Sequence, residues 1–214
     1  MPTLDDLLRE STFRDTTFTR LDLQAVDLSD KEFTNCVFQF LRGEGSVWKR
    51  ARLEDCVFED CDLTRAQVGH ARFFGATFRR SKLMGIDWSG LGPNPTVAFE
   101  ECDLRYASFV KLNLRKTTFR ACKAIEANFI ECDLKEAEFP DTDLGGTNFE
   151  RSDLTKANFS TARNAFIHPT RNTVKHTRIP VESAVMIAHS FGMKVAGYTD
   201  ASGSDEGNPR GRKR

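Results

Sequence analysis

Six cysteines and four histidines are the side chains best suited to metal binding or nucleophilic catalysis, and their spacing argues against both. They are Cys36, Cys56, Cys61, Cys102, Cys122 and Cys132, and His70, His168, His176 and His189. No two cysteines have the C-x-x-C spacing of zinc sites, and no serine, cysteine or carboxylate is tied to a histidine by a catalytic motif. A glycine-rich phosphate-binding loop is also missing from the sequence. We therefore predict no catalytic residue, no metal, no cofactor and no small-molecule substrate, and we expect a protein that is not an enzyme.

Disulfide bonds are the one cysteine chemistry that the spacing leaves open. Cys36 and Cys56 are twenty residues apart, and so are Cys102 and Cys122. Such pairs would be unusual in a cytosolic protein, where thiols are kept reduced. All six cysteines fall at the same small position of a sequence repeat described below, which favours buried, unreactive thiols.

Charged side chains are the second candidate for chemistry, because their signs are segregated along the chain. The total is neutral, with 31 basic and 31 acidic residues. A basic belt lies between residues 104 and 125 and contains Arg105, Lys111, Arg115, Lys116, Arg120 and Lys123. An acidic belt follows and contains Glu126, Glu131, Asp133, Glu136, Glu138, Asp141, Asp143, Glu150 and Asp153.

Two interpretations of these belts stay open. In one, both are solvated surface and neutralise each other. In the other, the acidic belt imitates the regular negative charge of a DNA backbone and attracts a basic DNA-binding groove. For the second interpretation the candidate contact residues are Glu126, Glu131, Glu136, Asp141 and Glu150.

A period of five residues organises the elements that must carry these side chains. A bulky apolar residue recurs at every fifth position, as in Phe99, Leu104 and Phe109, and a mostly small residue lies two positions before each. A period of five matches neither the 3.6 residues of an α-helix turn nor the alternation of a strand. Self-similarity at a fixed period is typical of a solenoid.

Residues twenty apart resemble each other, which predicts four sides per turn. The first column of identical residues is Phe18, Phe38, Phe58 and Phe78, and the second is Phe99, Phe119, Phe139 and Phe159. Successive square coils would stack about 4.8 Å apart, so about seven coils make a rod on the order of 34 Å long. We predict an all-β solenoid over residues 13–163, with the bulky side chains along its axis.

The period is interrupted near 41–50 and near 90–96, and both breaks are candidate recognition loops, because loops on a rigid scaffold often bind partners. The candidate residues are Arg42, Trp48, Lys49, Leu91, Pro93 and Asn94. Trp48 also falls on the five-residue period, so its side chain could instead point into the core. If the second break leaves the side order intact, Met84, Val110 and Ile130 form an exposed apolar column.

The two ends of the chain leave the period. Residues 1–12 form an N-terminal cap with a short helix at 3–10, capped by Thr3 with Asp6 three residues later. The helix is expected to cover the first coil, and the alternative is a flexible arm. Residues 164–197 contain an apolar helix after Pro180 that must cover the last coil, pair with a second copy, or do both. Residues 198–214 are rich in glycine, serine and charge and are expected to be disordered. No secretory signal or membrane-spanning run is present, so we expect a cytoplasmic protein.

Segments such as CDLRY (102–106), CDLKE (132–136) and ANFST (157–161) match the consensus A-(D/N)-L-x-x, and the chain over residues 11–163 resembles the pentapeptide-repeat proteins. The resemblance implies a right-handed quadrilateral β-helix. The layout is similar to the quinolone-resistance (Qnr-like) type, in which two loops interrupt the coils and a C-terminal helix forms a two-fold homodimer. It implies a dimer interface formed by Val185, Ile187, Phe191 and Met193.

This resemblance also implies a function. The protein would be a non-catalytic partner of DNA gyrase or topoisomerase IV that acts as a DNA mimic, protects the enzyme against quinolone-type poisons, and binds neither nucleic acid nor membrane directly. The alternative is a structural or adaptor solenoid for protein–protein interaction that has no topoisomerase role.

Overall fold

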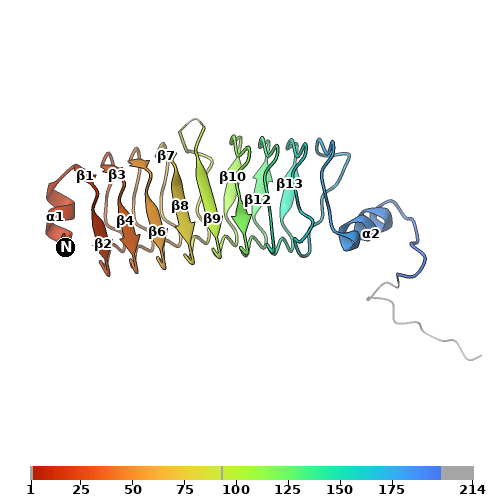
Figure 1. Ribbon diagram of the computed structural model, residues 1–214, viewed down its shortest axis with the longest axis horizontal. Helices are drawn as coiled ribbons and strands as arrows, with labels where there is room; N and C mark the ends of the chain where they lie inside the picture. Colours follow the sequence, from red (N-terminus) through yellow and green to blue (C-terminus); the bar gives the residue numbers. More distant parts are fainter. Residues whose placement is uncertain (1, 93, 199–214) are drawn as a thin grey trace, which may run out of the picture.

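The chain folds into a rod of stacked coils with a helix at each end (Figure 1). The structure is a computed structural model, and it describes residues 2–92 and 94–198. The helices are α1 (Leu4–Arg9) and α2 (Val181–Ser190). The strands are β1 (Thr12–Arg14), β2 (Thr17–Thr19), β3 (Glu32–Thr34), β4 (Val37–Gln39), β5 (Arg52–Glu54), β6 (Val57–Glu59), β7 (Arg72–Phe74), β8 (Ala76–Arg79), β9 (Val97–Glu100), β10 (Ser108–Val110), β11 (Phe119–Arg120), β12 (Asn128–Ile130) and β13 (Asn148–Glu150).

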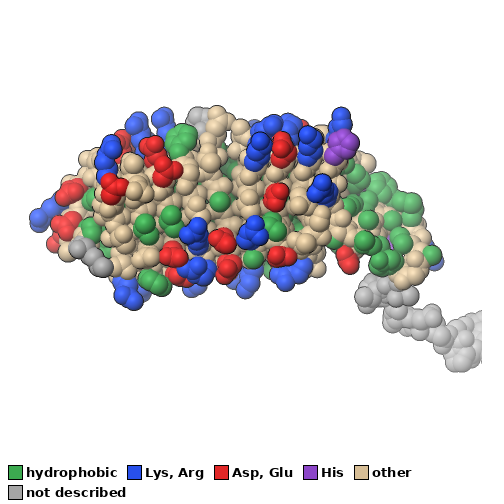
Figure 2. Space-filling model, in the orientation of Figure 1, with side chains coloured by type: hydrophobic (Ala, Val, Ile, Leu, Met, Phe, Trp, Pro, Cys, Tyr) green, Lys and Arg blue, Asp and Glu red, His purple; other side chains and the backbone are tan. Residues whose placement is uncertain are grey.

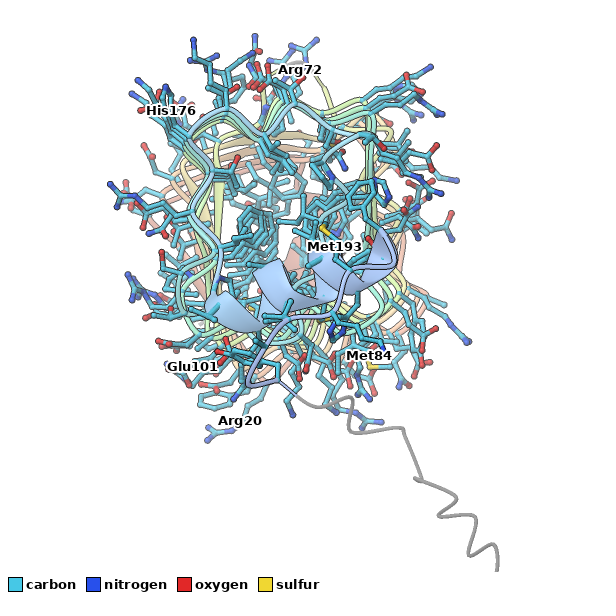
Figure 3. The ribbon with its side chains drawn as sticks, turned by 90° about the vertical axis from the view of Figure 1, so that its right-hand side faces the viewer. Arg20, Arg72, Met84, Glu101, His176 and Met193 are labelled. Atoms are coloured by element: carbon cyan, nitrogen blue, oxygen red, sulfur yellow. The ribbon has the colours of Figure 1, made fainter. Side chains whose placement is uncertain are left out.

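All strand pairs are parallel and join residues one coil apart, which confirms the predicted β-solenoid. Phe18 is opposite Phe38, and Phe38 is opposite Phe58. The sheets have the orders β1-β3-β5-β7, β2-β4-β6-β8-β9-β11 and β10-β12-β13. Isolated parallel bridges continue these sides and form the fourth, so the rod is square in cross-section (Figure 3).

Bulky side chains from all four sides fill the rod axis. The phenylalanines of one side stack directly, with ring centroids 4.5 Å apart for Phe38 and Phe58 and 4.8 Å for Phe58 and Phe78. Rings from neighbouring sides meet edge to face, as Phe129 and Phe139 do. Burying each such side chain contributes about 1.5–3 kcal/mol, and a stacked or edge-to-face pair adds about 0.5–1.5 kcal/mol.

The Asp or Asn that often precedes the bulky residue stabilises the turn at the corner of the coil. The carboxylate of Asp103 accepts the backbone N–H of Arg105, and Asp133 accepts that of Lys135, both at 3.2 Å. The residue that follows turns into the left-handed region, with φ +61° at Tyr106. An Asp or Asn side chain that accepts a hydrogen bond from the backbone N–H two residues on stabilises such a turn. The corner residue Tyr106 is exposed.

One side of the rod carries a ladder of alternating charge, here called the charge ladder. Its rungs, each bridged to the next, are Asp22, Arg42, Asp62, Lys82, Asp103, Lys123, Asp143 and Arg163. Ion pairs join Arg42 to Asp22 at 3.4 Å and Lys82 to Asp62 at 3.0 Å. Its seven steps of about 4.8 Å make the charge ladder about 34 Å long.

The predicted interruption at 41–50 is wrong, because these residues continue the coil. The backbone N–H of Gly43 donates to the carbonyl of Asp62, and that of Trp48 donates to Gln67, both at 2.7 Å. The period was hidden by an exchange of sizes: Leu41 is buried at the small position, and Gly43 stands at the bulky one. A Cβ on Gly43 would lie 2.8 Å from the Leu63 side chain, which fills the vacated space.

The segment 90–96 departs from the coil only briefly: the Gly92 N–H still donates to the Ala71 carbonyl at 2.8 Å, and the Thr96 N–H donates to the Phe73 carbonyl at 3.0 Å. The chain between β8 and β9 bulges outward from the rod (Figure 1). It adds a single residue to the stacking register, since Phe78 is opposite Phe99 and the offset becomes twenty-one. The predicted apolar column is wrong for this reason. Met84 lies against Arg105, whose Nη2 is 3.4 Å from its Sδ, while Val110 pairs with Ile130.

The two helices cover the ends of the rod. Thr3 and Asp6 form the predicted capping box of α1, and Leu7 is fully buried on the first coil. The Lys31 ammonium donates to the carbonyls of Leu8 and Glu10 and so ties the end of this helix to the coil.

At the other end, α2 lies across the last coil (Figure 3). The buried Ser183 hydroxyl donates to the Ala165 carbonyl at 2.5 Å. Of the predicted tail at 198–214, only Tyr198 lies within the described residues.

Candidate partner-binding surfaces

The rod interior offers no room for a substrate in the part of the chain that the structure describes. A small hollow of about 10 Å³ lies beside Val68, which stands between Trp48 and Trp88 in their column. The Trp88 indole N–H has no hydrogen-bond partner there, because Ile86 occupies the place that Ser46 has beside Trp48. Space of this size holds about one water molecule.

The cysteines are buried and free, as the repeat predicted. All six lie within the described residues and are at most 2% exposed. Burial raises the pKa of Cys61 to about 12 and that of Cys132 to about 11, so both thiols are neutral near pH 7. The pKa of Cys56 is also raised, first by its hydrogen bond to Cys36 and then by burial. Within residues 2–92 and 94–198, no group of three or more His, Cys, Asp or Glu side chains is arranged to hold a metal ion.

Trp48 is a core residue and not a loop anchor. Its side chain is 2% exposed, and its ring lies 5.6 Å from those of Phe38 and Phe58. The neighbouring candidates stay on the surface: Arg42 is a rung of the charge ladder, and Lys49 is exposed beside α1. The first group of predicted loop residues is therefore part of the regular coil.

The second group lies on a short loop that adds one residue to the coil. Asn94 is exposed, and its side-chain Oδ1 accepts a hydrogen bond from the Asn113 side-chain amide Nδ2 at 2.8 Å. Leu91 is half-buried against the core, which fixes the base of the loop. Pro93 lies outside the described residues. The loop thus presents Asn94 from an anchored base.

Four residues of the acidic belt form a ring one coil high. Glu126, Glu131, Glu136 and Asp141 occupy the four successive left-handed corners of one coil, with φ between +54° and +58°. Glu150 lies one coil further on and pairs with Arg151 at 3.0 Å. The acids therefore surround the rod and do not run along it as a row.

Basic residues of the adjoining coils interleave with this ring. Glu131 lies between Lys111 and Arg151 and pairs with them at 3.7 and 2.9 Å. Asp133 pairs with Arg115 at 3.5 Å and with Lys135 at 3.3 Å. Pairing of this kind reduces the negative field that a basic groove would meet.

A charged groove near the C-terminal end was missed by the sequence analysis. It is a hollow of about 840 Å³ lined by Lys116, Thr118, Glu136, Glu138, Lys156, Asn158, His176, Thr177 and Arg178. Its two edges are columns of residues twenty apart, so the signal was present in the period. Grouping charges by their position along the chain separates residues that the coil brings together.

Apolar side chains gather over α2 at the end of the rod (Figure 2). Val181 is 59% exposed, Met186 43%, Phe191 50% and Met193 55%. A hollow of about 280 Å³ lies between α2 and the last coil and is lined by Ile167, Pro169, Val174, Thr177, Ile179, Ala184 and Ile187. Of the predicted dimer residues, Phe191 and Met193 are exposed, Val185 is half-buried, and Ile187 faces this hollow. No helix among the described residues is long and apolar enough to cross a membrane.

Comparisons with known proteins agree with this architecture. A family profile described as "Pentapeptide repeat region" matches residues 95–163, and one described as "Pentapeptide repeats (8 copies)" matches residues 49–87. Protein McbG of Escherichia coli is 36% identical over 179 residues, which cover 84% of this chain and 96% of McbG.

Two further relatives carry quinolone resistance in their descriptions. The quinolone resistance pentapeptide repeat protein QnrB96 of Scandinavium goeteborgense is 29% identical over 110 residues, which cover 47% of this chain and only 51% of QnrB96. The solved structure of trypsin-treated QnrB1, a plasmid-mediated fluoroquinolone resistance protein, aligns with a TM-score of 0.64. That alignment has 21% identity and covers 86% of this chain and 89% of QnrB1, so it shows the same fold. Together the profiles and the McbG match show that this chain belongs to the pentapeptide-repeat family.

Proposed function

We propose that this protein is a non-catalytic binding protein that attaches to a type II DNA topoisomerase, gyrase or topoisomerase IV, and protects it against quinolone-type poisons. The observation that carries the proposal is its similarity to QnrB96, a quinolone resistance protein, within the fold of QnrB1. The filled rod axis supports a binding role, because the chemistry left to the protein is on its surface. A topoisomerase partner places the protein in the cytoplasm.

Two surfaces are candidates for the contact with the enzyme. One is the loop 90–96, where Asn94 is held out from a fixed base. The other is the acidic belt, in which the corner residues Glu126, Glu131 and Asp141 are exposed and Glu136 is half-buried. In a DNA-mimic mechanism these acids take the place of phosphates in the basic groove of the enzyme.

A homodimer is part of the same proposal. The exposed apolar residues of α2, with Phe191 and Met193 at its end, are the surface through which two copies would pair. Two rods joined end to end would present each loop and each acidic ring twice, and paired sites raise the strength of attachment.

The test is a supercoiling assay with purified gyrase, relaxed plasmid and ciprofloxacin, repeated with topoisomerase IV and its decatenation substrate. We expect the protein to restore activity at drug concentrations that stop the enzyme alone. The Asn94→Ala variant should keep the rod intact, because Leu91 still anchors the base of the loop, and it should lose part of the protection. If neither enzyme is protected or inhibited at any protein concentration, the proposed function is wrong.

A second candidate is an adaptor for protein–protein interaction with no topoisomerase role. The pairing of Glu131 with both Lys111 and Arg151 favours it, because a surface of interleaved charges resembles a protein interface more than a DNA backbone. Failure in the supercoiling assay, combined with recovery of a different stable partner, would support this alternative.

A further inference from the structure

Two neighbouring corners of the rod have the same order of charge but differ in pairing. At one corner Lys111, Glu131 and Arg151 stack one coil apart, and their ion pairs close the column at 3.7 and 2.9 Å. At the next corner Lys116, Glu136 and Lys156 stack at the same three levels. None of the ion pairs that the described residues form includes any of these three. The second corner is therefore open where the first is closed.

The open corner forms one edge of the charged groove. The other edge is the strand column Thr118, Glu138, Asn158 and Arg178 on the adjoining side. Figure 3 labels His176 at this corner, at the end of the rod nearest α2. The groove of about 840 Å³ crosses four coils, or about 14 Å at a spacing of about 4.8 Å. Its charged side chains are left available to a partner.

The charges are arranged in bands across the groove. Lys116 supplies a positive band, Glu136 with Glu138 a doubly negative one, and Lys156 a second positive one. Arg178 adds positive charge at the last level. A complementary partner presents an acid opposite Lys116, two bases opposite Glu136 and Glu138, an acid opposite Lys156 and an acid opposite Arg178. A nucleic acid does not fit, because the two glutamates in the middle repel phosphate.

The spacing of the bands selects the form of the partner. An α-helix lying along the rod presents one row of side chains per turn of about 5.4 Å, so over three steps it drifts by about 2 Å from the coil spacing. Long lysine, arginine and glutamate side chains absorb that difference. An extended strand presents one face every second residue, about 6.6 Å, and drifts by more than a whole coil over the same distance.

We propose that this groove docks an α-helix of a partner protein that lies parallel to the rod and carries an acid, two bases, an acid and an acid on successive turns. Exposed ion pairs contribute little to affinity, so the groove sets the register and the choice of partner more than the strength of binding. That the partner is a topoisomerase rests on the proposed function above; the groove itself does not.

The first test uses a probe that is independent of any topoisomerase. A fluorescent, alanine-based helical peptide carries the four bands in the stated order, and a second peptide has the same composition in scrambled order. We compare the wild type with Glu136→Lys/Glu138→Lys in the groove and with Glu126→Lys/Glu131→Lys, which makes the same charge change on the same coil outside it. We expect the ordered peptide to bind the wild type and the outside variant alike, and the groove variant at least about tenfold more weakly.

The groove proposal is overturned if the ordered peptide does not bind the wild type, if the scrambled peptide binds equally well, or if the outside variant loses as much affinity as the groove variant. The same two variants then enter the gyrase assay. Loss of protection by the groove variant alone assigns the groove to the topoisomerase, and equal loss by both supports contact through the acidic belt instead. If the wild type gives no protection, the proposed function fails and the peptide result still decides the groove.

Discussion

Replacing Trp48 by alanine separates a core residue from a residue of a binding loop. The indole is 2% exposed, lies 5.6 Å from the rings of Phe38 and Phe58, and donates to the Ser46 hydroxyl at 2.8 Å. Removing a buried aromatic side chain costs about 3–5 kcal/mol in free energy of unfolding. The new cavity would join the hollow of about 10 Å³ beside Val68, so we expect a loss of about 4–5 kcal/mol.

Urea denaturation followed by far-UV circular dichroism measures this loss as a lower transition midpoint. The control is Lys49→Ala, one residue further on and exposed, which should change stability by no more than about 0.5 kcal/mol. Trp48→Phe keeps an aromatic ring in the stack and gives up the Ser46 hydrogen bond, so about 1–2 kcal/mol is expected.

The opposite result would show that the column assignment is wrong. If Trp48→Ala unfolds at the same urea concentration as the wild type and removes topoisomerase protection, Trp48 is an exposed binding residue. The coil through residues 41–50 would then have to be redrawn as a loop.

Four further predictions follow from features of the structure. Lys31→Met removes the donor that holds the end of α1, so limited proteolysis should cut the N-terminal segment faster than in wild type while the rod persists. Ellman's reagent should find no fast-reacting thiol in the native protein and six after denaturation, because all six cysteines are buried. The pKa of Glu59 is lowered by hydrogen bonds from Gln39, the larger effect, and from Arg80. The pKa of Asp30 is lowered by its hydrogen bond from Arg50. The stability that they contribute is therefore present above about pH 4 and is lost as the pH falls below it, which melting temperatures across acid pH will show. Phe191→Asp should give monomers by light scattering if α2 forms the dimer, and a persistent dimer would place the interface elsewhere.

The core could be predicted from the sequence because one requirement acts on every coil. A side chain that must reach the axis recurs at a fixed position, so the phenylalanine columns and the buried thiols, such as Cys102, follow from spacing alone. The coil through residues 41–50 was not predicted, because a large residue, Leu41, is at the small position and a small one, Gly43, is at the bulky position. A pattern read one position at a time does not detect that the two residues together fill the usual volume.

The surface could be predicted only in part. Counting charges along the chain found the belts but not their shape, because consecutive corners face four directions and residues twenty apart are neighbours. Glu131 and Glu136 belong to the same belt in sequence, yet one is paired on both sides and the other borders an open groove. The length of the segment at 90–96 obscured the register as well, since only one residue is added to the coil.

The charge ladder has a consequence for how the rod assembles. Coils with nearly interchangeable phenylalanine cores can mis-stack when a nascent chain skips one coil, and such errors are characteristic of repeat proteins. A skip would set Asp22 against Asp62 and Arg42 against Lys82, and like charges directly opposite each other are destabilising. The alternation of charge therefore disfavours a stack that skips one coil. Contacts between identical phenylalanine rings cannot distinguish the two registers.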